Sequence, residues 1–347
     1  MLRRTGFGTT GAEVDAAVSQ GIARYGETIL TADPANDPGA RATPRPDVAP
    51  IAPLAGNASM AQRMRRDQQR SAQQQALTAW WVRRMVTVTQ PFGEKLTFCW
   101  HNHFATAASK VANPAWMLSQ NDKLRTLGRG NFHTLAYSMI TDAAMLRWLD
   151  GEENTAQAPN ENLAREFMEL FTLGHGDAYT ETDVRQGARA LTGLRVNPDG
   201  TTWVDPMVHD GGTKTILGVT GPLGAAGFVD AVLAQPGSAG FVVMRTWGQL
   251  VSDSPPAPEI VDRLVAAYGG GLDLAAMLTA MLTAPEFVAA HGTSVVAPIE
   301  WVIGAARALR LPVKTDVETQ RLLRILNELG QVPFQPPSVG GWPSGMA

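Results

Sequence analysis

From residue 60 to its end, this chain is a succession of helix-forming segments separated by residues that begin and end helices. Residues 69–86 are rich in Gln, Ala and Trp, and their helix should end near Pro91, because proline interrupts helices. The last segment begins with a capping box formed by Thr315 and Glu318. Further helices are expected at residues 91–104, 113–128, 131–149, 160–174, 180–193, 225–234, 238–251, 256–268, 272–282, 298–310 and 316–329.

A clear strand signal occurs in one segment, LRVNPDGTTWV, at residues 194–204. Two short runs of β-favouring residues flank the sequence Asn-Pro-Asp-Gly, which is typical of a hairpin turn. We therefore expect a mainly α fold, a multi-helix globular array with one small β-hairpin near residues 194–205.

The length of 347 residues suits one large domain or two smaller ones. We expect a single helical domain over residues 1–347, with two lobes at residues 1–205 and 220–347 as the alternative. Residues 33–59 are rich in Pro, Ala and Asp and lack periodicity, so they are expected to form a loop or linker.

Composition excludes several classes of function. The net charge of −3 gives no basic excess for nucleic acid, and no run of about 20 apolar residues is present to span a membrane. The single cysteine, Cys99, excludes an intrachain disulfide, and its apolar neighbours favour a buried residue. The paired Arg3 and Arg4 are not followed by the apolar segment of an export signal, so the chain as written is expected in the cytoplasm.

The segment WHNHF holds two of the six histidines, His101 and His103, with Asn102 between them. In a helix the two imidazoles point about 160° apart and cannot easily bind one metal ion, whereas in an extended segment they share a face and could chelate it. The residues that flank this segment favour the helical alternative. The alternative role for His103 is a core histidine with one hydrogen-bond partner, because buried polar groups must find partners.

A second group of polar residues lies on the helix expected at residues 160–174. Glu166 and Glu169 border its apolar stripe, and a partly buried carboxylate there would have a raised pKa suited to general acid–base chemistry. The alternative is a solvated face with intrahelical pairs such as Glu161 with Arg165.

On the helix expected at residues 180–193, Arg185 and Arg189 share an edge. They could face Glu166 and Glu169 in an ion-pair network, or hold an anion, because the guanidinium fork matches carboxylate and phosphate.

Two glycine-rich loops complete the candidates. His209, Asp210 and Lys214 surround a Gly-Gly pair in residues 208–218, where backbone N–H groups can be exposed. The Pro- and Gly-rich segment near the C-terminus presents Trp342, which caps a pocket or pins the tail to the core.

These segments support two functions. In the first, a hydrolase, they converge on one pocket where a histidine is the general base, Glu166 orients or protonates, and Arg189 or Lys214 holds an anionic group of a small-molecule or polymeric substrate. In the second, a non-catalytic binding or accessory protein, the same groups pair with one another. One divalent metal ion is the candidate cofactor, with His101 and His103 as candidate ligands. The candidate catalytic residues are His101, His103, Glu166, His209 and Asp210, and the candidate substrate-binding residues are Asn102, Arg165, Glu169, Arg189, Lys214 and Trp342.

Five segments in order resemble the bacterial family catalogued as domain of unknown function 1800. They are LRRTGFG, WHNHF, NENLAREFMELFTLG with YTETDVRQGARALTG, HDGGTKTILG and PPSVGGWPSG, and together they cover nearly the whole chain. The resemblance implies an accessory or degradative role and a sulfatase-like partner, and it makes a periplasmic or secreted location the alternative to the cytoplasm. This chain departs from the family in lacking a visible export signal and in stopping just after Trp342, where a further helix is expected.

Overall fold

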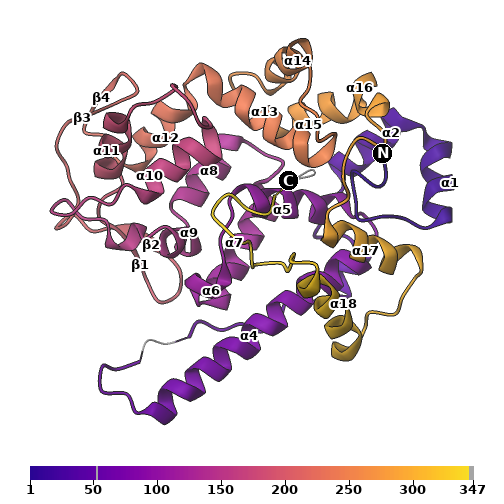
Figure 1. Ribbon diagram of the computed structural model, residues 1–347, viewed down its shortest axis with the longest axis horizontal. Helices are drawn as coiled ribbons and strands as arrows, with labels where there is room; N and C mark the ends of the chain where they lie inside the picture. Colours follow the sequence, from indigo (N-terminus) through magenta and orange to yellow (C-terminus); the bar gives the residue numbers. More distant parts are fainter. Residues whose placement is uncertain (52–53, 344–347) are drawn as a thin grey trace.

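Helices make up most of the molecule (Figure 1). The computed structural model describes residues 1–51 and 54–343, and the fold is 57% helical. Within these residues the only sheets are two antiparallel two-stranded hairpins. The expected mainly α fold is therefore confirmed. In the described ranges no single helix is long and apolar enough to cross a membrane. The helices α12 (Ala225–Leu233) and α13 (Pro236–Leu250) meet that test only as a pair bent by 82°.

The expected helices are present, with small differences at their ends. They are α4 (Met60–Thr87), α5 (Phe92–His103), α7 (Pro114–Leu127), α8 (Phe132–Ile140), α9 (Ala143–Trp148), α10 (Asn162–Glu166), α11 (Glu181–Ala190), α12 (Ala225–Leu233), α13 (Pro236–Leu250), α14 (Pro258–Tyr268), α15 (Leu274–Thr283), α17 (Pro298–Ala308) and α18 (Asp316–Glu328).

Two of these segments differ from a single regular helix. The segment at 131–149 breaks into α8 and α9, because the Asp142 side chain accepts hydrogen bonds from the N–H groups of Ala144 and Met145 and so caps α9. After Glu166, α10 continues as the π-helix η2 (Phe167–Thr172). Further helices that the sequence reasoning missed are α1 (Gly11–Gln20), α2 (Ile22–Thr31), α3 (Pro38–Arg41), α6 (Ala108–Val111), η1 (Gly151–Glu153) and α16 (Pro285–Ala289).

The expected hairpin near residues 194–205 is present, and a second hairpin accompanies it. Strands β1 (Leu194–Val196) and β2 (Thr202–Val204) pair antiparallel. Strands β3 (Lys214–Ile216) and β4 (Val219–Gly221) form the second hairpin, which begins inside the loop expected at residues 208–218 and ends beyond it. Its two-residue turn, Leu217-Gly218, has positive φ at both positions, the conformation that tight hairpins require.

Helix α4 is the longest element, and its first half extends away from the body of the molecule (Figure 1). It begins with a capping box between Ser59 and Gln62, and its residues are buried only from Leu77 onward. The buried half carries Trp80 and Trp81, which anchor the helix to the core. Burial therefore follows the change from Arg- and Gln-rich to aromatic sequence along one helix.

Helix α5 lies at the centre of the fold and is buried on several faces (Figure 1). Leu96 and Trp100 belong to one hydrophobic cluster, while Phe98 belongs to a second cluster that includes Trp81 and Phe334. The helix thus separates two parts of the core.

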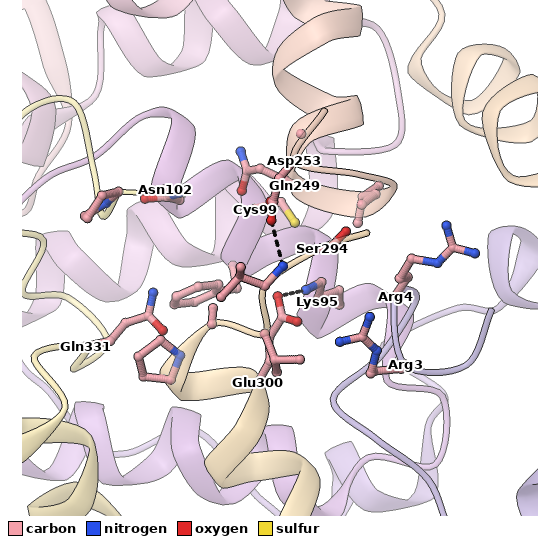
Figure 2. Close-up of a pocket in the computed structure, with 18 residues that line it drawn as sticks. Arg3, Arg4, Lys95, Cys99, Asn102, Gln249, Asp253, Ser294, Glu300 and Gln331 are labelled. Atoms are coloured by element: carbon pink, nitrogen blue, oxygen red, sulfur yellow. Dashed lines mark hydrogen bonds and ion pairs between the residues drawn. The ribbon is translucent and has the colours of Figure 1, made fainter. Parts of the chain in front are cut away.

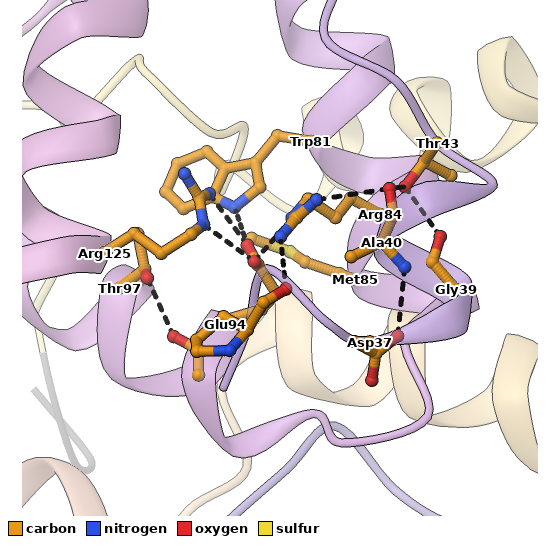
Figure 3. A network of polar contacts seen from close by, with 12 residues as sticks. Asp37, Gly39, Ala40, Thr43, Trp81, Arg84, Met85, Glu94, Thr97 and Arg125 are labelled. Carbon is orange, nitrogen blue, oxygen red and sulfur yellow. Dashed lines mark hydrogen bonds and ion pairs between the residues drawn. The ribbon is translucent and has the colours of Figure 1, made fainter. Parts of the chain in front are cut away.

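A buried polar network joins α5 to its neighbours (Figure 3). The Glu94 carboxylate accepts hydrogen bonds from Arg84 of α4 at 2.6 Å, from Arg125 of α7 at 2.8 and 2.9 Å, and from the indole N–H of Trp81 at 2.9 Å. Burial alone would raise the pKa of Glu94, but the charges and hydrogen bonds of Arg125 and Arg84 outweigh it and lower the pKa to about 2. Glu94 is therefore ionised, and its hydrogen bonds hold α5 to α4 and α7.

The segment expected as a loop or linker packs closely on the body over its first half. The Asp37 carboxylate accepts hydrogen bonds from the backbone N–H groups of Thr89 and Gln90 at 3.1 and 2.7 Å. Gly39 lies so close to the Thr87 backbone that a Cβ there would clash with it. This half contains the short helix α3 and is held in place beside α4. Part of the second half, residues 52–53, lies outside the described residues.

Candidate functional site

One face of α5 borders a cavity of about 120 Å³, which we call the α5 pocket (Figure 2). Lys95, Cys99 and Asn102 line it, and their spacing of i, i+4, i+7 places them on a single helical face. The other walls come from the start of the chain, the end of α13, the segment 294–298, the start of α17, and Gln331 and Pro343 near the end of the described residues. Segments far apart in the sequence therefore meet here.

The centre of the pocket wall is an ion pair between Lys95 and Glu300 of α17. The Lys95 side chain is only 2% exposed, whereas that of Glu300 is 18% exposed. A buried ammonium needs a partner because removal from water is costly, and Glu300 is the carboxylate that supplies it. This pair ties the centre of α5 to the first turn of α17.

Arg3 and Arg4 lie together at one side of the pocket but have different surroundings (Figure 2). The buried Arg4 guanidinium donates hydrogen bonds to the carbonyls of Val251 and Phe287 and lies 3.8 Å from the Phe287 ring centroid. The Arg3 side chain is exposed and makes no hydrogen bond or ion pair to any residue that the structure describes. Arg3 is thus the cation available to a ligand, while Arg4 holds the fold.

On the side of the pocket opposite Arg3, two amide side chains each make one hydrogen bond to the backbone. The Asn102 Oδ1 accepts a hydrogen bond from the Trp342 N–H at 2.7 Å, and the Gln331 Oε1 accepts one from the Ile299 N–H at 2.8 Å. The amide nitrogens of Asn102 and Gln331 donate to no residue in the described part of the chain. These two amides are therefore hydrogen-bond donors for a bound molecule.

Cys99 is not a reactive thiol in this setting. Burial raises its pKa to about 12, with the nearby Lys95 acting in the opposite direction. The thiol therefore stays protonated at neutral pH, and the expectation of a buried cysteine is confirmed.

His101 and His103 point to opposite sides of α5, as the helical alternative requires. The His101 ring packs among Trp81, Phe98, Phe334 and Trp342, and its Nε2 accepts a hydrogen bond from the Phe334 N–H at 3.1 Å. Burial lowers the pKa of His101 to about 3. This imidazole is neutral and is enclosed by aromatic rings.

His103 occupies the other part of the core. Its ring packs against Trp100, Phe104 and Phe171, and its Nε2 donates a hydrogen bond to the Phe171 carbonyl at 2.9 Å. That carbonyl lies in the last turn of η2, where helical carbonyls lack intrahelical partners. Burial, followed by the charge of Arg245, lowers the pKa of His103 to about 3, and its Nδ1 has no partner among the described residues. The two imidazoles therefore do not face a common metal ion.

Glu166 and Glu169 lie on α10 and η2, away from the α5 pocket. Burial and the charge of Glu169 raise the pKa of Glu166, as the sequence suggested. Glu169 contacts His175 Nδ1 at 2.8 Å and accepts a hydrogen bond from the Tyr179 hydroxyl at 3.2 Å. Arg165 binds both Glu161 and Glu181. The ion pair that crosses to α11 is thus Arg165–Glu181.

The loop at 208–218 is closed by its own polar groups. Arg189 binds Asp210 through two hydrogen bonds, at 2.7 and 3.3 Å, instead of facing Glu166 and Glu169. Lys214 donates to the carbonyls of Asp210 and Gly212, and its side chain is fully buried. His209 Nδ1 donates to a carbonyl of the segment after α11 at 2.8 Å. The polar side chains of this loop are therefore occupied by hydrogen bonds that fix the loop against α11.

Of the candidate residues, the structure thus brings Asn102 to the α5 pocket, with the backbone N–H of Trp342 bonded to it, and leaves the others outside the pocket lining. Within the described residues, no group of three or more His, Cys, Asp or Glu side chains is close enough to hold a metal ion. Sequence reasoning missed Lys95, Arg3 and Glu300. The i, i+4, i+7 spacing of Lys95, Cys99 and Asn102 is the sequence signal that marks the pocket face of this helix.

The structure is that of a mainly α protein with two small hairpins and a pocket beside α5 built from distant segments. The chain belongs to the family described as "Protein of unknown function (DUF1800)", which matches residues 1–347. No curated protein and no solved structure matches it. The resemblance seen in the sequence is therefore confirmed over the whole chain.

Proposed function

We propose that this is a binding protein whose α5 pocket holds a small acceptor-rich anion. The observation that carries the proposal is a polar cavity where several distant segments meet and leave Arg3, Asn102 and Gln331 with unused donors. A cavity of about 120 Å³ has room for several heavy atoms, because one water needs only about 10–15 Å³.

The chemistry of the wall favours a carboxylate. Arg3 supplies a guanidinium that matches a carboxylate fork, and the two amide nitrogens donate to further oxygens. Lys95 and Glu300 neutralise each other, and the other charged residues of the lining are Arg3, Arg4 and Asp253, so the wall keeps one net positive charge. A short dicarboxylate or an amino acid would satisfy these donors.

A hydrolytic function stays a prediction from the sequence. It requires an imidazole at a cavity wall within hydrogen-bond reach of a substrate. His101 and His103 lie among aromatic rings, and the pKa of each is lowered to about 3, so neither supports that function. The expected sulfatase-like partner and the cellular location likewise stay predictions.

Cavity filling tests the proposal with little risk to the fold. Gly248 lines the pocket, and a Cβ there would meet no atom within 4 Å, so Gly248→Leu places a side chain into open space. Gly237→Leu is the matched control, because Gly237 lies on the same helix, is exposed and has equally open surroundings.

The measurement is isothermal titration calorimetry with succinate, acetate and glycine as probes. We expect saturable binding of succinate, loss of binding in Gly248→Leu, unchanged binding in Gly237→Leu, and roughly tenfold weaker binding in Arg3→Gln because a charged hydrogen bond is lost. Absence of saturable binding by all three probes, or equal binding by both glycine variants, contradicts the proposal.

A further inference from the structure

A second cavity, of about 570 Å³, lies between the loop at residues 33–45 and the helices α4 and α7. We call it the arginine pocket, and Figure 3 shows part of its wall. Its volume is within the range of about 300–1,000 Å³ that small-molecule sites occupy. Five arginines line it, together with two aspartates: Arg41, Arg45, Arg84, Arg125, Arg129, Asp33 and Asp122.

The positive charges of the arginine pocket exceed the negative ones. Arg84 and Arg125 share the single carboxylate of Glu94, which lies behind them. Asp122 contacts both Arg125 and Arg45, each at 3.1 Å. With Asp33 as the third carboxylate, five guanidiniums face three carboxylates, which leaves a surplus of two positive charges.

Two of the five arginines form no ion pair with a described carboxylate, although the charge of Asp33 acts on one of them, Arg129. Arg129 donates to the carbonyls of Leu30 and Ala32 at 2.9 and 2.8 Å and has no carboxylate within ion-pair distance in the described residues. The Arg41 guanidinium has no hydrogen bond or ion pair to any described residue, and it is exposed. Both therefore retain N–H donors for a ligand.

The inner arginines are held in place before any ligand arrives. The Arg84 and Arg125 side chains are only 10% and 8% exposed, and their guanidiniums lie 5.8 and 5.5 Å from the Trp80 ring centroid. Trp80 is itself fixed by a hydrogen bond from Nε1 to the Thr43 carbonyl at 3.0 Å. Such preorganised charges act on an anion without reorganisation, and partial burial strengthens their field.

We propose that the arginine pocket binds a phosphate-bearing small molecule, with its dianionic phosphate between Arg41 and Arg129. A surplus of two positive charges matches a phosphate dianion, and guanidinium forks match its oxygens. The remaining volume accommodates the organic part of the ligand beside the loop at 33–45. This site is separate from the α5 pocket, and none of the arginines that line it lines the other.

The test uses inorganic pyrophosphate as the probe and the full chain, by calorimetric titration at fixed ionic strength with chloride as the compensating anion. Arg41→Gln removes an exposed guanidinium that has no hydrogen bond or ion pair to a described residue, so the fold should be kept. Arg321→Gln is the matched control, because it removes the same charge from an exposed position on α18. We expect one pyrophosphate per chain, with at least tenfold weaker binding in Arg41→Gln and unchanged binding in Arg321→Gln.

Three outcomes overturn the proposal. The first is an absence of saturable binding above the chloride background. The second is an equal loss in Arg41→Gln and Arg321→Gln, which indicates attraction by net charge alone. The third is a loss in Arg3→Gln with none in Arg41→Gln, which assigns the anion to the α5 pocket and leaves that proposal standing.

Discussion

Glu94 and Lys95 are adjacent in α5 and both bury a charge, but their surroundings differ. Glu94 is enclosed by two guanidiniums and an indole N–H, and it does not line the α5 pocket. Lys95 has one carboxylate partner, Glu300, and both residues line that pocket. The fully paired Glu94 therefore holds neighbouring helices together, whereas Lys95, with one partner beside a cavity, belongs to the wall of a candidate binding site.

Glu94→Gln should give the largest effect. It leaves Arg84 and Arg125 buried without their shared carboxylate, and breaking a buried ion pair costs about 3–5 kcal/mol. Urea unfolding monitored by circular dichroism measures this loss. Glu328→Gln, an exposed charge change on α18, is the control and should alter the free energy of unfolding by less than about 0.5 kcal/mol. A change in Glu94→Gln as small as the control's contradicts the structural role.

Acid should destabilise the protein through its enclosed histidines. The pKa of His103 is about 3 in the folded protein and about 6.5 in the unfolded chain, so below pH 6.5 the unfolded state binds more protons. Stability is then lost as pH falls, at about 1.4 kcal/mol per pH unit for each such imidazole once protonation of the unfolded state is complete. Unfolding measured between pH 7.5 and 5 avoids most carboxylate titration.

Substitution separates this effect from general acid sensitivity. His103→Phe removes the titrating group and should flatten the pH dependence, even though loss of the hydrogen bond to Phe171 lowers stability at every pH. His291→Gln is the control substitution, at an exposed histidine whose side chain hydrogen-bonds to no described residue. An unaltered slope in His103→Phe rules out the enclosed neutral imidazole as its source.

Lys95→Met should have a smaller effect than Glu94→Gln. Methionine fills the space of the lysine stem, and Glu300, which is 18% exposed, can be solvated through the α5 pocket. We expect a loss of about 1–2 kcal/mol, within the usual range for single substitutions. The same urea titration measures it. If Lys95→Met lowered the free energy of unfolding more than Glu94→Gln does, the distinction drawn between Glu94 and Lys95 would be wrong.

The helices could be predicted from the sequence because their signals are local. The capping box of Thr315 and Glu318 and the spacing of apolar residues act within a few residues of each other. The pocket could not be predicted in the same way. Lys95 and Glu300 are 205 positions apart, and nothing near Lys95 identifies its partner.

At the loop of residues 208–218 the sequence suggested a functional site, but the structure shows side chains that are already paired. His209, Asp210 and Lys214 are residue types suited to catalysis, yet backbone carbonyls and Arg189 occupy them. Residue type and spacing predict which face or loop a group lies on. Whether that group is paired depends on tertiary contacts. A fully paired group holds the fold, whereas an unpaired one can bind a ligand.

Arg3→Gln should give the smallest effect on stability, and this makes it the sharpest comparison with its neighbour. Arg3 has no partner in the described residues, so its loss should change the free energy of unfolding by less than about 0.5 kcal/mol. Arg4→Gln removes hydrogen bonds to the Val251 and Phe287 carbonyls and should cost about 1–3 kcal/mol. Thermal and urea unfolding of both variants test the difference. Equal losses would place Arg3 in the fold's own hydrogen bonding and remove the free cation on which succinate binding at the α5 pocket depends.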